Sequence, residues 1–304
     1  MKSLKTVLTL SFLLVALSFF SLAQAETLKP FVLGKAVPGS MADVVEYTKV
    51  QLTGQGFTIV GTYSPYPNAT VICASHPDIS AAAAKAENGG FGAAQRVAIT
   101  EVEGKLQLTY VNPAYLGTAY GLGKLEAVSA KLEAALGHEQ EYGSEKGIKE
   151  KKLGPGKYHY KMLMPYFDDV HKLNTFADHE TAIQTVEANL AAGKGGTAKV
   201  YRIDLPGKDV SVFGVAIPQG DGANEGRKDT DSEIMGIIDY KDIRSTAYLP
   251  YEIMVQGKEV IALESRFRIA VHFPDTSMMG SHGFTAIMSS TKGIRLALEA
   301  VAGK

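Results

Sequence analysis

One order of expected elements runs through this chain twice, and this repeat limits the fold more than any other feature. In each half a helix precedes two strands, and a hairpin then leads through a proline into a closing helix. The hairpin strands alternate apolar and polar residues, which is typical of antiparallel strands with one buried face. The sequence therefore predicts an α+β fold with two tandem related halves, each an antiparallel sheet with helices packed on one face.

Local signals set the expected element boundaries. Ser40 suits the N-cap of the first helix, at 40–53, and Asp43 lies three positions later. The elements expected after it are strands at 57–63 and 69–75, a short helix at 77–86, a hairpin at 95–102 and 105–111, and one long helix at 115–136. Those expected in the second half are a helix at 180–192, strands at 198–205, 210–217 and 233–239, a hairpin at 247–255 and 260–273, and a helix at 290–302.

The first 25 residues have the three parts of a signal peptide. Lys2 and Lys5 precede an apolar run at 7–22, and a small-residue cleavage box follows at 23–25. The run is shorter than the roughly 20 apolar residues of a membrane span, although an uncleaved anchor remains the alternative. We therefore expect export to the periplasm, with no membrane span after cleavage. The expected divisions are a signal peptide at 1–25, a first α+β domain at 26–137, a basic linker at 138–157 and a second, divergent domain at 158–304.

Charge and cysteine content exclude some classes of function. The formal net charge of −1 supplies no basic field, so nucleic acid is not an expected partner. Cys73 is the sole cysteine, so no internal disulfide can form. It lies in the apolar stretch 69–74, which favours a small buried hydrophobic residue over a reactive thiol or a soft metal ligand.

Two stretches of the first half resemble a known family. They are Leu52-Thr53-Gly54-Gln55-Gly56-Phe57-Thr58-Ile59-Val60-Gly61-Thr62-Tyr63, after the first helix, and Thr109-Tyr110-Val111-Asn112-Pro113, before the closing helix. Together they make residues 31–136 similar to the bacterial domain of unknown function 302, and the second half resembles a divergent copy of it. The resemblance implies an α+β domain that often pairs with itself, and it brings no activity.

Two segments rich in methionine and histidine lie outside this resemblance. One is 158–171; read as a strand, it puts Tyr158, Tyr160, Met162 and Met164 on one face. The other is 272–284. Thioether and imidazole groups together suit Cu(I), so copper is the candidate cofactor, although methionine is also an adaptable core residue. The candidate metal ligands are His159, His272, Met278, Met279 and His282.

Charged side chains suggest a second kind of site. Arg266 and Arg268 would share a face of the expected strand at 260–273 and could grip a carboxylate or phosphate. The candidate ligand-binding residues are Arg96, Arg266, Arg268, Asp239 and Arg244, in a groove between the halves. The alternative is an internal network of ion pairs.

The familiar catalytic signatures, such as G-x-S-x-G and H-E-x-x-H, are missing from the sequence. The leading hypothesis is an exported binding or accessory protein for a small molecule or an envelope protein partner. Two alternatives remain open. One is a periplasmic copper-binding accessory protein that uses the Met/His loop, and the other is an uncharacterised hydrolase that uses Ser281, His282 and Asp275.

Overall fold

The computed structural model describes residues 27–218 and 225–304. The expected signal peptide at 1–25 lies outside these residues. Within them, no helix combines the length and the apolar character that a membrane crossing needs.

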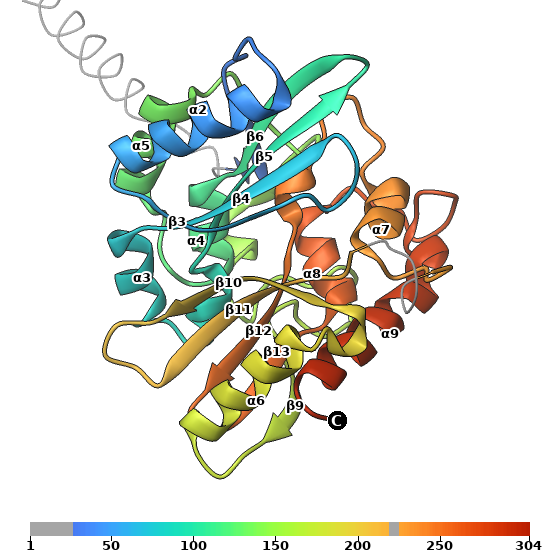
Figure 1. Cartoon of the computed structure of the whole chain (residues 1–304). Coiled ribbons are helices and arrows are strands. Elements are labelled where there is room, and N and C mark those ends of the chain that lie inside the picture. The colour runs from blue at the N-terminus through green and yellow to red at the C-terminus, as the bar shows by residue number, and fades with distance from the viewer. Residues whose placement is uncertain (1–26, 219–224) are drawn as a thin grey trace, which may run out of the picture.

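The fold is α+β, with one antiparallel sheet in each half (Figure 1). The described part of the first sheet has the strand order β3-β4-β5-β6-β2-β7, and that of the second β10-β11-β12-β13-β9. The first-half strands are β2 (Phe31–Leu33), β3 (Thr58–Tyr63), β4 (Ala69–Ser75), β5 (Gln95–Val102), β6 (Lys105–Val111) and β7 (Gln140–Tyr142). Those of the second half are β9 (Val170–Thr175), β10 (Ala198–Asp204), β11 (Val210–Ala216), β12 (Tyr251–Gln256) and β13 (Glu259–Leu263).

The helices follow the same repeat. The first half contains α2 (Met41–Gly54), α3 (Pro77–Ala83), α4 (Pro113–Ala119) and α5 (Glu126–Leu136). The second half contains α6 (His179–Ala191), α7 (Asp231–Ile238), α8 (Ser265–His272) and α9 (Phe284–Val301). Along the chain, β2-α2-β3-β4-α3-β5-β6-α4-α5 is matched by β9-α6-β10-β11-α7-β12-β13-α8-α9. The predicted pair of related halves is therefore present in the topology.

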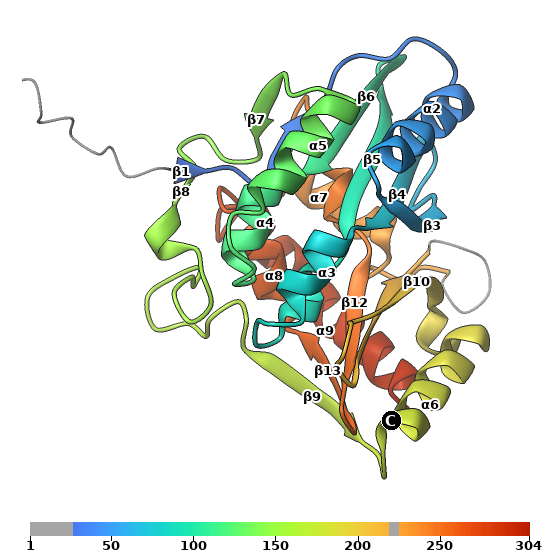
Figure 2. The same cartoon turned by 90° about the vertical axis from the view of Figure 1, so that its left-hand side faces the viewer.

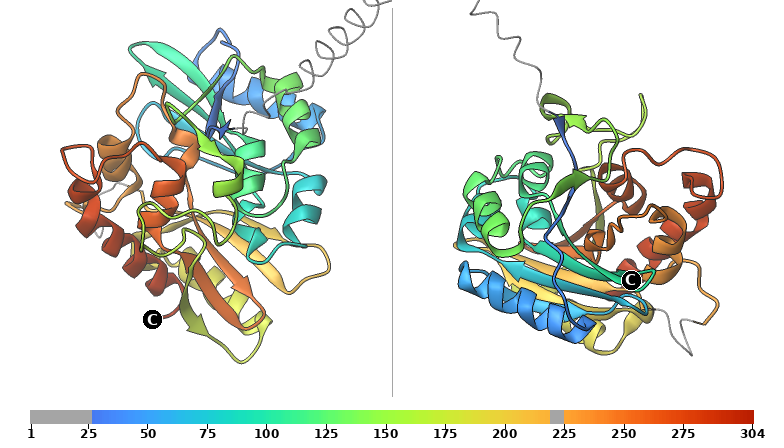
Figure 3. Two further views of the ribbon diagram at one scale, coloured as in Figure 1. Left: turned by 180° about the vertical axis from the view of Figure 1, so that it is seen from behind. Right: turned by 90° about the horizontal axis from the view of Figure 1, so that it is seen from above.

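The segment expected to be a linker pairs with the first two strands in the described part of the chain. Strand β7 pairs with β2 at the edge of the first sheet, although the sequence assigned it to the linker. Farther along, β8 (Ile148–Lys149) pairs with β1 (Thr27–Leu28) in a small separate sheet. The coil after β8 then crosses over α8, as the view from behind in Figure 3 shows, and Tyr158 donates a hydrogen bond to the Ala270 carbonyl there.

Several expected boundaries are confirmed because their signals are local. The Ser40 hydroxyl accepts a hydrogen bond from the backbone of Asp43, and the Asp43 carboxylate accepts one from the Ser40 backbone, which completes a capping box at the start of α2. The hairpin of β5 and β6 turns at Glu103-Gly104, where both residues have positive φ. The second hairpin turns at Gly257, also at positive φ.

Three expected elements are wrong. The long helix at 115–136 is two helices, because Gly121 and Gly123 adopt positive φ between α4 and α5. The strand at 233–239 is helix α7, and its N-cap is Thr230, whose hydroxyl accepts a hydrogen bond from the backbone of Glu233. The strand at 260–273 ends at Leu263, and α8 follows, so Arg266 and Arg268 lie on a helix. Residues 158–169, part of the segment read as a strand above, form a coil of turns and bends.

The two halves share one interior. In Figure 2 the first half lies above the second, with α2 and α5 over the first sheet and α6 and α9 beside the second. Edge strands β3 and β10 lie against each other. The short helix before β5, Gly89–Gly92, packs on β11 and β12, and the one before β12, Thr246–Tyr248, packs on β4, β5 and β6. Each half therefore covers part of the other half's sheet.

Candidate functional site

The predicted site residues fall into separate places. Arg96, Arg268 and His272 meet in the interior at the junction of the halves. Asp239 and Arg244 border an open groove, whereas Arg266 and Met278 line a pocket in the second half. The remaining metal candidates, His159, Met279 and His282, have other surroundings, so neither predicted set forms one site.

The junction cluster is a buried ion-pair network, which was the alternative to a ligand site. Arg96 on β5 donates a short hydrogen bond to Oε1 of Glu252 on β12. Nε of Arg268 on α8 lies 2.8 Å from Oε2 of the same carboxylate. All three side chains are almost completely removed from solvent. Glu252 therefore serves as the counter-charge to two guanidinium groups, one from each half.

His272 completes this cluster as a neutral imidazole. Burial, followed by the charges of Arg268 and Arg96, lowers the pKa of His272 well below its ordinary value. Its Nδ1 lies 2.9 Å from the Arg268 carbonyl oxygen, an acceptor, so Nδ1 carries the proton. The lone pair on Nε2 then faces Arg96 Nη2 at 3.4 Å. Both ring nitrogens of His272 are thereby engaged within the cluster, and its role as a metal ligand stays a prediction that these contacts do not support.

Asp239 and Arg244 contact each other at the junction groove. Both Asp239 carboxylate oxygens accept a hydrogen bond from the Ser245 backbone, at 2.8 and 2.9 Å, and Arg244 Nη1 donates to the Asp239 carbonyl. The groove beside them holds about 920 Å³ of space and is bordered from the first half by residues that include Tyr66 and Glu101. This place is distinct from the cluster around Arg96, which is closed to solvent.

Burial raises the pKa of two carboxyl groups near the junction, so that at neutral pH Asp231 is mostly protonated and Asp239 is about half protonated. Burial raises the pKa of Asp231 to about 8, although the backbone N–H of Ile217 and the Tyr63 hydroxyl oppose the shift. Burial likewise raises the pKa of Asp239 to about 7, against the hydrogen bond from Ser245. The folded state therefore favours the neutral form of both carboxyl groups.

The raised pKa values predict that stability falls as pH rises. An unfolded aspartate releases its proton near pH 4 (roughly 3.9), so the folded state binds more protons than the unfolded state from about pH 4 to pH 8. The free energy of unfolding should decrease through this window. The double variant Asp231→Asn/Asp239→Asn should give a flatter profile in urea denaturation measured at a series of pH values. Asp242→Asn, at an exposed position, is the matched control, and a double variant with the wild-type slope would refute the assignment.

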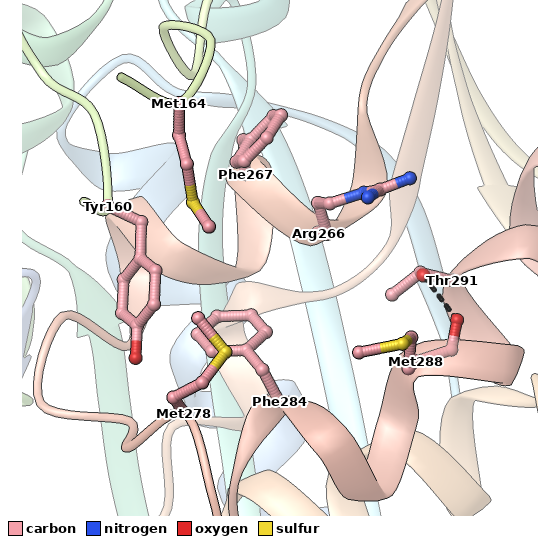
Figure 4. A pocket seen from close by; sticks show the side chains of 8 residues that line it. All are labelled: Tyr160, Met164, Arg266, Phe267, Met278, Phe284, Met288 and Thr291. Carbon is pink, nitrogen blue, oxygen red and sulfur yellow. Dashed lines mark hydrogen bonds between the residues drawn. The ribbon is translucent and has the colours of Figure 1, made fainter. Parts of the chain in front are cut away.

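The pocket in the second half is the candidate functional site (Figure 4). Its cavity volume is about 90 Å³, within a wider depression of about 460 Å³ that includes space open to solvent. Its walls come from the coil before β9, from α8, from the loop after α8 and from the first turns of α9. The lining residues are Tyr160, Met164, Arg266, Phe267, Met278, Phe284, Met288 and Thr291.

Hydrogen bonds fix the framework of this pocket. The Tyr160 hydroxyl donates to the Thr276 carbonyl at 2.7 Å, which ties the coil to the loop after α8. The Tyr160 ring meets the Phe284 ring edge to face, with 4.6 Å between centroids. Ser265 donates to the Thr291 carbonyl at 3.0 Å and joins α8 to α9. A thioether forms no such strong bonds, so the methionine side chains can change conformation while the bonded residues around them stay in place.

Arg266 is the one charged residue among those lining the pocket. Its Nε lies 3.2 Å from Oε1 of Glu264, and its side chain is 55% exposed. Figure 4 shows the guanidinium group directed away from the three methionine side chains, toward the edge of the pocket. The pocket therefore combines an apolar interior with a cation at its edge.

Sequence reasoning found part of this pocket and missed the rest. Phe284, Met288 and Thr291 were not predicted, although their spacing of four and three residues indicates one face of a helix. That signal is visible only if α9 is taken to begin at 284 instead of 290.

The other metal candidates point elsewhere. Met279 is 70% exposed. His282 has Nδ1 2.7 Å from the Ile237 carbonyl oxygen, and its ring stacks on Tyr240 at 4.0 Å. His159 stacks on Tyr166 at 5.4 Å. The structure therefore does not place these imidazoles beside Met278 as one set of ligands.

Cys73 lies in the interior of the first half, and burial raises the pKa of its thiol to about 12. This agrees with the interpretation as a small buried hydrophobic residue. In comparisons with known proteins, no family model matches the chain and no curated protein matches it.

Proposed function

We propose that this protein is a binding protein whose pocket in the second half accepts a small, mainly apolar molecule with an anionic end. The observation that supports this most directly is the lining: three thioethers and three aromatic rings with Arg266 at the edge. The cavity volume is about 90 Å³, so a ligand would enter as the methionine side chains adjust and would extend into the open part of the pocket. The anionic end of the ligand would lie at Arg266.

Burial of apolar surface would supply most of the affinity. Each Å² of apolar ligand surface removed from water contributes roughly 25 cal/mol. Methionine walls suit this purpose because an unbranched, polarisable side chain can adapt to ligands of different shape. Phe267 and Phe284 offer flat surfaces on which a ring or chain can lie.

The internal repeat also supports a specialised pocket here. Residues 120–125 separate α4 from α5 in the first half, whereas the longer segment 273–283 separates α8 from α9. Helix α9 has 18 residues and α5 has 11. The pocket is thus built from segments in which the second half differs from the first. We propose that binding takes place in the periplasm, in agreement with the expected signal peptide, and that release to an envelope protein partner follows.

The contacts favour binding over the hydrolase alternative. His282 holds the Ile237 carbonyl with Nδ1, and Asp275 accepts hydrogen bonds from Ser144 and from the backbone of Glu145. Within the described residues, neither group forms a hydrogen bond with Ser281. The arrangement gives Ser281 no base of the kind that nucleophilic catalysis needs.

Fluorescent probes test the proposal. The uncharged 1-N-phenylnaphthylamine and the anionic anilinonaphthalene sulfonate should both gain fluorescence on binding the mature protein. Met288→Trp, at the exposed edge of the pocket, should fill the entrance and weaken both probes at least about tenfold, which corresponds to about 1.4 kcal/mol. The measurement is a titration of each probe at constant ionic strength.

Two variants make this test specific. Leu296→Trp, on the exposed side of the same helix and outside the pocket lining, should leave both affinities unchanged. Arg266→Gln should weaken the anionic probe and leave the uncharged probe unaffected. Equal binding by wild type and Met288→Trp would mean that the probes, and the proposed ligand class, do not use this pocket.

A further inference from the structure

We propose that Met164, Met278 and Met288 form a site for Cu(I) within the same pocket. This goes beyond the binding of an apolar molecule and does not depend on it, because it rests on the sulfur atoms and not on the apolar surface. The three side chains come from three separate segments: the coil before β9, the loop after α8 and the first turns of α9.

The distribution of methionine is the first observation. The chain contains nine methionines, and five of them are Met162, Met164, Met278, Met279 and Met288, on the segments that border the pocket. Met162, Met279 and Met288 are 83%, 70% and 61% exposed. Met288 is exposed and fills no core, so packing does not explain its position at the pocket. Met164 and Met278 are partly buried against the core, and their thioethers line the same pocket.

The chemistry of the pocket selects the ion. Figure 4 shows the side chains of Met164, Met278 and Met288 around one space, and Met164 and Met278 extend toward each other. Thioethers are soft, uncharged ligands, which favour Cu(I) over Zn²⁺ and Cu²⁺. Three neutral ligands leave the ion with its single positive charge, and the faces of Tyr160 and Phe284 can stabilise a cation. Glu264 pairs with Arg266 and so reduces the repulsion between the guanidinium group and a bound Cu(I) ion.

The site differs from the one expected from sequence, because it contains no imidazole. His272 directs its free nitrogen toward Arg96, and His282 is engaged by Ile237 and Tyr240. A thioether ligand loses no proton when it binds metal, whereas histidine and cysteine ligands compete with protons. The affinity for Cu(I) should therefore be the same at pH 5 and at pH 8.

The test is an anaerobic titration of the mature protein with Cu(I), supplied directly as Cu(I) in competition with bicinchoninate. We expect one equivalent of tightly held Cu(I), with an affinity independent of pH from 5 to 8. In protein labelled with ¹³C at the methionine methyl groups, the resonances of Met164, Met278 and Met288 should shift together. A stoichiometry well below one, or shifts confined to other methionines, would overturn the proposal.

Sulfur-free variants separate this proposal from the proposed function. The triple variant Met164→Leu/Met278→Leu/Met288→Leu keeps the pocket apolar, so it should still bind 1-N-phenylnaphthylamine but hold Cu(I) about 100-fold less tightly. Met162→Leu/Met279→Leu, outside the pocket lining, should bind Cu(I) as wild type does. Unchanged Cu(I) affinity in the triple variant would overturn the copper site and leave the apolar pocket standing. Loss of Cu(I) binding in the control pair would also overturn it.

Discussion

Replacement of Glu252 by glutamine is expected to destabilise the protein by about 3–5 kcal/mol, the cost of breaking a buried ion pair by removal of one partner. The carboxylate lies between Arg96 and Arg268, which have almost no exposed surface. Glutamine preserves the shape of the side chain and removes the charge. Two buried guanidinium groups would then lose the carboxylate that pairs with both of them, and the neighbouring His272 can supply no negative charge. Urea denaturation at pH 7 measures the loss.

A surface pair provides the matched control. Glu187 on α6 lies 2.6 Å from Lys199 Nζ and 3.5 Å from Arg202 Nη1, so it too contacts two cations. All three side chains are partly exposed, and Glu187→Gln should cost less than about 1 kcal/mol. Equal losses in the two variants would show that burial does not set the value of the Glu252 network.

The substitution also tests how the halves are joined. Arg96 comes from the first half, and Glu252 and Arg268 come from the second. Simultaneous replacement of all three by apolar residues of similar volume leaves no unpaired charge, so Arg96→Met/Glu252→Leu/Arg268→Met should be far more stable than Glu252→Gln. This order of stability would mean that the network specifies how the two halves fit together and adds little net stability of its own.

The fold was predictable where local signals agree with each other. The hairpin of β5 and β6 has alternating residues on both sides of Glu103-Gly104, and α2 begins at a capping box. Helices α7 and α8 were missed because each is only eight residues long, and a short apolar run fits a strand as well as a helix. The break between α4 and α5 depends on Gly121 and Gly123, which lie in a region that otherwise looks helical.

The sites were predictable in residue type but not in arrangement. Arg96 and Glu252 are separated by 156 positions, so no local pattern indicates that they meet. Arg268 therefore seemed available to a ligand, although its charge is used inside the protein. Arg266, two residues away, lies on another face of α8 because successive residues of a helix diverge, and this face borders the pocket. The expected strand would instead have put both arginines on one side.

Gly61→Ala is the second substitution with a large expected effect, a loss of about 3 kcal/mol, at the upper end of what overpacking costs. A Cβ atom at Gly61 would lie 2.2 Å from the carbonyl oxygen of Val200 and 3.0 Å from its carbonyl carbon. The obstacle is backbone, which cannot rotate away as a side chain can. Both strands have an irregular register here, between Ile59 and Gly61 in β3 and between Lys199 and Tyr201 in β10.

The contact explains why the effect should reach beyond β3. Strands β3 and β10 are the edges at which the two sheets approach each other, so a methyl group at Gly61 must separate the halves or distort both bulges. Gly54→Ala, at the last residue of α2 with nothing within 4 Å of the new Cβ, is the control. It should be neutral or stabilise by up to about 1 kcal/mol. If Gly61→Ala unfolds at the same urea concentration as Gly54→Ala, the halves are not held in close contact at β3 and β10.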